Sequence, residues 1–377
     1  MGVAIGGVFP VIPVILIANG FDVLGVGVVT ALTALAFAVA VPAWGHFADV
    51  VVGRPRALQI AAIAAAAALA LTLLQVPPLV IALCYIGFAA GEAAFAPLSD
   101  ALAVNAVRDP RRDYARVRLL FSLSFAVATI GAGFLYDQTG YGPAPIIFAL
   151  GALVVVASAA FTPDVERAKE AASARFGSVG VAFASAPRLP LVLVALGLMH
   201  VGILAGFTFL SVRLQELGAE PSTIALSAGV AALTEVLGFL VMGALAQRLG
   251  IRAVFIASAA IYGACFVSWM FLDSPILIVA SRVATGFAFA GIAVAAVLTI
   301  AALLPGRLQA TGQALYQTTA FGVAAVIADV GGGLIYGSLG YAVVFGLAAL
   351  AAVLAAVVGA AALPRGRARF AEPSRAA

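Results

Sequence analysis

The segment Gly133-Phe-Leu-Tyr136-Asp-Gln-Thr-Gly140-Tyr141 recurs 200 residues later as Gly333-Leu-Ile-Tyr336-Gly-Ser-Leu-Gly340-Tyr341. Two glycines and two tyrosines keep the same spacing in both copies, and each copy closes a long apolar run. A second pair of segments, Gly45-His-Phe-Ala-Asp49 and Gly243-Ala-Leu-Ala-Gln247, is displaced by 198 residues. Two matches at nearly equal displacement predict that the chain consists of two related halves.

Twelve apolar runs account for most of the chain, and most of them reach the ~20 residues that a hydrocarbon core ~30 Å thick requires. Apolar residues make up 64% of the sequence and charged residues 10%, against roughly 25% charged in a soluble domain. A chain of this composition needs lipid as its solvent, so we expect an all-α membrane protein with twelve transmembrane helices. The predicted spans are 2–19, 23–45, 57–76, 79–106, 115–136, 144–161, 190–211, 222–246, 253–272, 275–303, 308–336 and 341–362.

The basic residues fall on one side of this pattern. Of the 20 Lys and Arg, only Arg213 lies in a connection on the other side and only Arg282 lies within a run. Cytoplasmic connections of membrane proteins carry the Lys and Arg excess. The asymmetry therefore predicts that both termini are cytoplasmic. The basic residues form no dense patch, which argues against a nucleic-acid partner.

The longest connection divides the chain in the middle. Residues 162–189 are polar and charged, and we expect a cytoplasmic linker with room for a short surface helix. The predicted domains are a six-helix bundle over 1–161, this linker, a second six-helix bundle over 190–363 and a cytoplasmic tail over 364–377. The first run is marginal because Met1 stands only nine residues before Pro10, so a true start upstream is one interpretation.

The loop after the second run resembles a signature of the major facilitator superfamily. That signature is Gly-x-x-x-Asp-basic-x-Gly-basic-basic, and this chain has Gly45, Asp49, Gly53, Arg54 and Arg56 in that order, with one extra residue. A related loop in the second half carries Gly243, Arg248 and Gly250. The resemblance implies a loop that acts as a cytoplasmic latch between two states; a plain basic loop that sets topology is the alternative.

Within the superfamily, the chain is most similar to the branch of lactose permease and the phenylpropionate and nucleoside proton symporters. By resemblance to lactose permease, Asp100 and Arg118 form a substrate pair, with an inner salt bridge as the alternative. Glu235, thirteen residues before Arg248, resembles the acidic position of that branch. The chain departs from lactose permease in one respect, since Leu277–Leu303 contains no His or Glu.

Four acids fall inside predicted spans, where each costs roughly 2.5–3.5 kcal/mol to insert. Glu92, Glu235 and His200 lie near the expected midplane, which is where substrate sites of such folds lie. Buried carboxylates exchange protons near neutral pH, so Glu235 and Glu92 are candidates to carry a coupling proton. For His200 a packing role is favoured over a titrating one.

Two further pairs of polar residues lie inside the predicted spans. Arg282 and Asp329 fall in the external third of their helices, and we expect them to pair as a gate or structural strut. Gln313 and Gln317 are four residues apart on one helix face, with Tyr316 beside them, and are expected to line the cavity.

These observations predict a secondary active transporter in a bacterial inner membrane, working as a monomer. A proton gradient would drive a small polar or anionic organic solute. A proton-coupled drug or metabolite exporter of the same fold is the first alternative, and a non-transporting membrane sensor or scaffold is the second. No phosphate-binding loop and no His/Cys cluster occurs in the sequence, so we expect no enzyme activity, no cofactor and no metal.

Overall fold

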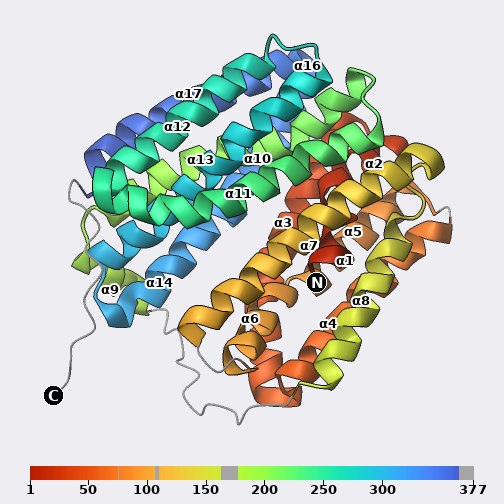
Figure 1. Ribbon diagram of the computed structural model, residues 1–377, viewed down its shortest axis with the longest axis horizontal. Helices are drawn as coiled ribbons and strands as arrows, with labels where there is room; N and C mark the ends of the chain where they lie inside the picture. The colour runs from red at the N-terminus through yellow and green to blue at the C-terminus, as the bar shows by residue number, and fades with distance from the viewer. Residues whose placement is uncertain (75, 107–109, 163–176, 365–377) are drawn as a thin grey trace.

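A computed structural model describes residues 1–74, 76–106, 110–162 and 177–364, and almost all of them are helical (Figure 1). Short 3-10 or π-helical segments join or extend several α-helices; they are η1 (Phe9–Val11), η2 (Phe47–Val52), η3 (Leu71–Leu74), η4 (Thr318–Val323) and η5 (Ile327–Gly331). The α-helices are α1 (Gly2–Gly6), α2 (Ile12–Ala18), α3 (Val23–His46), α4 (Arg54–Ala70), α5 (Pro78–Glu92), α6 (Phe95–Ala106), α7 (Pro110–Thr139), α8 (Ala144–Ala160), α9 (Gly177–Ser185), α10 (Leu189–Glu216), α11 (Pro221–Leu249), α12 (Ile251–Trp269), α13 (Pro275–Leu303), α14 (Gly306–Gln317), α15 (Ala324–Val326), α16 (Gly332–Leu339) and α17 (Tyr341–Ala362).

Each of the twelve predicted spans is largely helical where the structure describes it. Ten of these helical stretches are long and apolar enough to cross a membrane. The other two, Gly2–Ala18 and Ala144–Ala160, are apolar but shorter. The chain is therefore an integral, multi-pass membrane protein, while the count of twelve spans and the side of the termini stay predictions.

Prolines explain why two predicted spans are broken. The first span is split into α1, η1 and α2 around Pro10 and Pro13, because proline lacks the N–H that the preceding turn would bond. The fourth is split at residues 93–94 between α5 and α6. Pro97 stands in the first turn of α6, so the carbonyl of Ala93 loses its usual helical partner.

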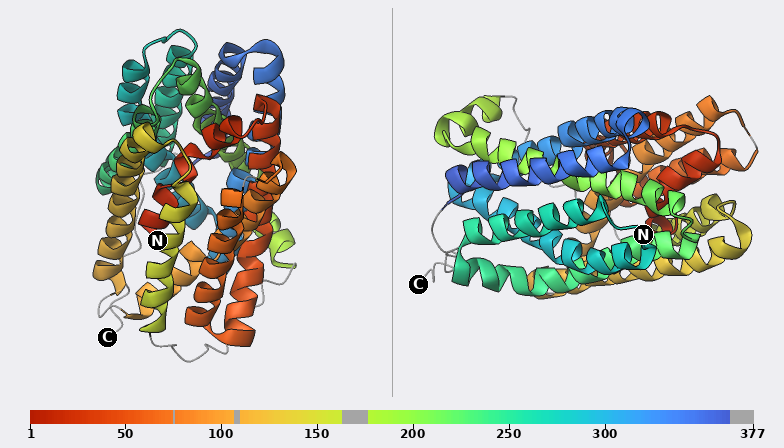
Figure 2. Two further views of the ribbon diagram at one scale, coloured as in Figure 1. Left: turned by 90° about the vertical axis from the view of Figure 1, so that its right-hand side faces the viewer. Right: turned by 90° about the horizontal axis from the view of Figure 1, so that it is seen from above.

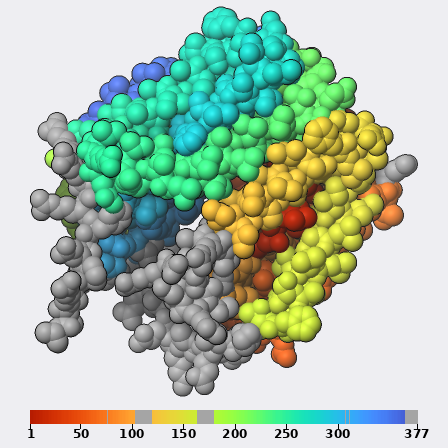
Figure 3. All heavy atoms as spheres, viewed as in Figure 1, coloured from red at the N-terminus to blue at the C-terminus, as the bar shows by residue number. Residues whose placement is uncertain are grey.

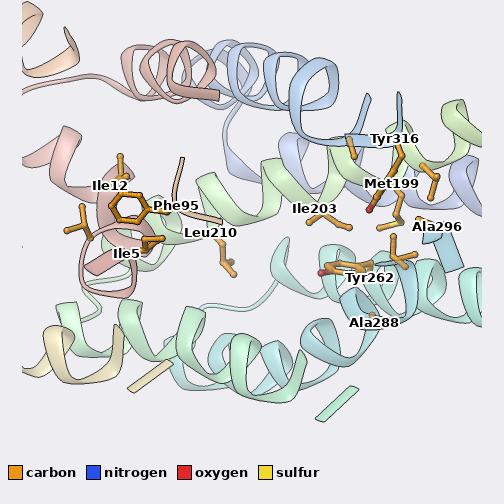
Figure 4. Packing of buried hydrophobic residues seen from close by; sticks show 14 of the residues in the cluster. Ile5, Ile12, Phe95, Met199, Ile203, Leu210, Tyr262, Ala288, Ala296 and Tyr316 are labelled. Carbon is orange, nitrogen blue, oxygen red and sulfur yellow. The ribbon is translucent and has the colours of Figure 1, made fainter. Parts of the chain in front are cut away.

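The helices gather in two groups that run roughly along one direction (Figures 1 and 2). Most helices before residue 162 pack mainly on one another, as do most of those after residue 177, whereas α3 and α7 pack as closely on the second group, chiefly on α16 and α11. Figure 4 shows part of one buried apolar cluster that extends through both groups: Ile5, Ile12 and Phe95 lie together among helices of the first group, and Tyr262 and Tyr316 among helices of the second. The described part of the predicted linker includes α9, while residues 163–176 and 365–377 lie outside the described residues. The predicted domain boundaries stay a prediction.

The sequence repeat is also a repeat of local geometry. Gly140 and Gly340 both take positive φ, +65° and +86°, which favours glycine. The Tyr136 hydroxyl donates to the Gly7 carbonyl at 2.6 Å, and the Tyr336 hydroxyl donates to Glu216 at 2.8 Å. Each repeat tyrosine therefore ties the end of its helix to a neighbouring helix.

Candidate functional site

At one end of the molecule, here called the closed end, backbones of the two groups touch directly. A Cβ on Gly333 of α16 would lie 3.0 Å from the Val23 carbonyl oxygen and 3.3 Å from the Gly27 Cα of α3. A Cβ on Gly27 would collide with the Asp329 carbonyl oxygen. Only residues without a side chain allow this approach.

A second contact at the closed end involves the other copy of the repeat. A Cβ on Gly133 of α7 would lie 2.5 Å from the Ala225 Cβ and 2.9 Å from the Ser222 Cα on α11. The Ser222 N–H donates to the Asp137 carboxylate at 2.8 Å. Gly133 and Gly333, which are equivalent in the repeat, thus each pack a helix of their own group against the other group.

The opposite end, here called the open end, is not sealed in this way. The buried residues of α3 are Val26, Gly27, Val29 and Ala31, all in its closed-end half. From residue 32 to residue 46 no residue of α3 is buried. In α11, four of the six buried residues likewise precede residue 230. Figure 3 shows the same face as Figure 1 with all heavy atoms, α11 lying above α14 and beside α7 of the first group.

Two phenylalanines meet between the groups. Phe9 in η1 and Phe207 in α10 have ring centroids 5.5 Å apart. Phe9 is 43% exposed although its neighbours Val8 and Pro10 are buried. The displacement from Phe9 to Phe207 is 198 residues, the same as that of the Gly45 and Gly243 segments. That displacement is the sequence signal that would have singled out this pair, which our sequence analysis missed.

The two midspan carboxylates belong to different groups of helices. Glu92 ends α5 at the break before α6 and is half-buried. None of the residues that the structure describes donates a hydrogen bond to it or forms an ion pair with it. Glu235, also half-buried on α11, interacts electrostatically with Arg282 and Tyr262 on the neighbouring helices. The structure does not bring the two carboxylates together.

The predicted ion pair between Arg282 and Asp329 is wrong. Arg282 is only 8% exposed, and its guanidinium donates to the Ser227 carbonyl at 3.3 Å and to the Thr285 hydroxyl at 3.0 Å. Asp329 instead accepts a hydrogen bond from Thr208 at 2.8 Å. Both helices are apolar on most sides, so sequence periodicity could not fix their rotation, and the two side chains face different neighbours.

His200 is fully buried and both of its ring nitrogens have partners. Nδ1 lies 2.8 Å from the Leu196 carbonyl oxygen and Nε2 lies 3.3 Å from the Tyr316 hydroxyl. Tyr316 is therefore buried against α10 (Figure 4), while Gln313 is half-buried and Gln317 is exposed.

The predicted substrate pair falls partly outside the described side chains. Asp100 is half-buried on α6, whereas Arg118 lies on α7 at a position whose side chain the structure does not describe. Their pairing stays a prediction.

The loop after α3 shows how the extra residue of the first copy is accommodated. The segment Phe47–Val52 is π-helical, and a π-turn holds one residue more than an α-turn. Asp49 then pairs with Arg54 at 3.2 Å. Gly53 and Gly250, which end the two copies, take closely similar backbone angles of φ +86°, ψ 155° and φ +92°, ψ 151°.

Neither Arg56 nor Arg248 forms an ion pair with any residue that the structure describes. Both are exposed. A Cβ on either Gly45 or Gly243 would meet nothing within 4 Å, so the structure shows no close helix approach at these two glycines.

A charged cluster that the sequence did not predict lies at the closed end. Arg213 on α10 donates to Asp273 at 2.7 Å and lies 3.7 Å from Glu216. Its guanidinium carbon lies 3.7 Å from the centre of the Tyr341 ring. This cluster joins the end of α10 to the connection before α13 and to the start of α17.

A family model described as the MFS_1 like family matches residues 3–347. The chain belongs to this family. The predicted resemblance to the major facilitator superfamily is thereby confirmed, while the branch within it stays a prediction. The relatives that match the chain are transporters. The protein is therefore a secondary transporter.

Among relatives of this MFS_1 like protein is the maltose permease of Geobacillus stearothermophilus, 29% identical over 334 residues, which are 88% of this chain and 84% of the permease. Among solved structures, a point mutant of the nucleoside transporter NupG has a TM-score of 0.83 at 16% identity, covering 96% of both chains. A peptide transporter of the POT type has a TM-score of 0.74 at 14% identity, covering 96% of this chain and 91% of its own. The structural matches show the fold alone.

Proposed function

We propose that the protein is a proton-coupled symporter of a small polar or anionic organic solute in a bacterial inner membrane. The two groups of helices would rock about a central site so that it opens to one side at a time. The observation that carries this proposal is a contrast between the two ends. The closed end is sealed by backbone contacts at Gly27, Gly133 and Gly333, whereas α3 has no buried residue from residue 32 to residue 46 and α11 has only two after residue 230.

The distribution of charge supports an open end that faces the cytoplasm. The Asp49 and Arg54 loop and the exposed Arg248 lie at that end of α3 and α11. At the closed end, Arg213 is neutralised by Asp273 and Glu216. This is the distribution that the positive-inside rule favours.

The polar and aromatic groups between the ends support an organic solute. The Phe9 ring offers an apolar face between the groups, and Glu92 and Glu235 offer acceptors for hydroxyl or amide hydrogens. Among the relatives are a maltose permease and a nucleoside transporter, both named for organic solutes. A carboxylate without a described cation, such as Glu92, is suited to carry a proton.

Transport by reconstituted protein tests the proposal. Proteoliposomes with an imposed pH gradient would be offered radiolabelled maltose, uridine or benzoate, and we expect at least one to accumulate only with the gradient. Glu235→Gln should abolish accumulation. Glu220→Gln, which alters an exposed acid at the start of α11, should leave it unchanged. Accumulation that ignores the gradient would refute the coupling, and gradient-driven efflux alone would indicate the exporter alternative.

A further inference from the structure

A small cavity lies between the two groups of helices, next to the contact of Phe9 with Phe207. Pro10 of η1 lines it from the first group, and residues of α10, α11 and α13 line it from the second, among them Phe207 and Arg282. Its volume is about 10 Å³, which is roughly the space that one water molecule needs. In this arrangement of the helices the cavity therefore has room for one atom of a ligand, such as a carboxylate oxygen.

Arg282 brings a buried positive charge to this cavity. Its Nε donates to the Ser227 carbonyl and its Nη1 donates to the Thr285 hydroxyl. Its other terminal nitrogen, Nη2, donates to none of the residues that the structure describes. Glu235 interacts electrostatically with Arg282, yet no Asp or Glu among the described residues forms an ion pair with it. A buried guanidinium that keeps free N–H donors favours a negative group in the space beside it.

Ser227 on α11 adds a second donor to the same cavity. It is only 5% exposed and lines the cavity, and its hydroxyl forms no hydrogen bond within the described part of the chain. Ser211 on α10 lines the cavity too, but its hydroxyl donates to the Thr208 carbonyl at 2.8 Å. Of these two serines, only Ser227 therefore has a hydroxyl hydrogen that is free to bond a ligand.

We propose that Arg282 and Ser227 form a binding site for one monovalent anionic group, either the carboxylate of an organic solute or a free halide. Both residues offer hydrogens, and a charge-assisted hydrogen bond from a guanidinium is strongest to an anion. Arg282 then contacts the ligand directly, instead of serving only as a strut between helices. This inference rests on the proposed function, and a carboxylate in the site would narrow the solute from polar or anionic to anionic.

Trp269 provides a reporter for this site. Its ring is fully buried and lies 5.7 Å from the guanidinium carbon of Arg282. The chain has two tryptophans, so Trp44→Phe leaves Trp269 as the only one. Purified protein in detergent would be titrated at constant pH with sodium acetate, with sodium chloride and with acetamide, which is the uncharged counterpart of acetate.

We expect acetate to change the Trp269 emission in a saturable way and to raise the thermal midpoint, because a ligand that binds the folded state stabilises it. Acetamide should do neither. A response to acetate without a response to chloride would assign the site to the carboxylate of a solute. Equal responses to the two anions would assign it to a free halide as well.

Two serine variants supply the matched comparison. Ser227→Ala removes the free donor and should weaken acetate binding about tenfold or more. Ser211→Ala removes a hydroxyl whose hydrogen is already bonded, and it should leave acetate binding unchanged. Arg282→Gln should abolish the response to acetate, and Arg282→Lys should recover part of it.

Three results would overturn the inference. They are equal effects of the two serine variants, equal responses to acetate and acetamide, and the absence of any saturable response to acetate in the parent protein. The binding measurement needs no gradient. Solute uptake that ignores a pH gradient while acetate still binds at Arg282 would therefore overturn the proposed symport alone.

Discussion

The substitution Gly133→Ala, which adds a single methyl group, tests the packing of the closed end. In Gly133→Ala the new Cβ would stand 2.5 Å from the Ala225 Cβ, whereas carbon atoms pack best at ~3.5–4.0 Å. The helices must separate by ~1 Å or more for the closed end to form. Overpacking of this kind costs ~1–3 kcal/mol.

This overpacking raises the free energy of the closed state only. When the closed end opens, α7 and α11 move apart and the methyl group is accommodated. A difference of ~1–3 kcal/mol then lowers the ratio of closed to opened molecules by a factor of about 5 to 150. The gain in helix propensity from glycine to alanine, ~1 kcal/mol, applies to both states and leaves this ratio unchanged.

Gly131→Ala is the matched control. Gly131 lies on the same helix, two residues earlier, and a Cβ there would meet nothing within 4 Å. Spin labels on Ala18→Cys and Ser338→Cys, two exposed residues at the closed end, would report the distance between the two groups in both variants by double electron–electron resonance at one pH. We expect Gly133→Ala to gain the long-distance population and Gly131→Ala to match the parent. Identical distance distributions for the two variants would refute the assignment of Gly133 to the seal.

Three further predictions concern stability and the basic loop. Arg213→Ala should lower the thermal midpoint in detergent, because it removes an ion pair with Asp273 and a cation–π contact, and Arg213→Lys should recover part of the loss. Trp269→Ala should cost ~3–5 kcal/mol of unfolding free energy, because its ring is fully buried, and unfolding in a denaturant series would measure this. Asp49→Asn should change stability by less than ~1 kcal/mol, since its pair with Arg54 is partly exposed, while slowing uptake in proteoliposomes; an unchanged rate would leave the loop a topology signal only.

The pattern of apolar runs was sufficient to locate the helices. It did not determine how each helix is rotated about its own axis, and so which side chains face which neighbour. The predicted spans 275–303 and 341–362 match α13 and α17, because long apolar runs bounded by polar residues leave little choice of ends. The sequence did not predict that α5 and α6 part at residues 93–94, although Pro97 was the available signal. It paired Arg282 with Asp329 because both share one depth, and depth alone does not say which neighbour a side chain faces.

For the candidate site, too, the sequence identified residues but not their contacts. The acids Glu92 and Glu235 are half-buried, yet their partners depend on helix rotation. Phe9 and Phe207 were detectable only by applying the repeat displacement to residues outside the two motifs. Asp329 was noticed as a charge, but its hydrogen bond from Thr208 joins residues that are 121 positions apart, which no local pattern contains.

The seal at the closed end is made largely of main chain, at Gly27, Gly133 and Gly333. Main-chain atoms are the same whatever the neighbouring side chains are. Substitutions elsewhere between the two groups that favour another solute can therefore accumulate during evolution while the contacts that close this end stay intact. Transporters that descend from a common ancestor with this fold can thus differ in their solute and still close through the same backbone contacts.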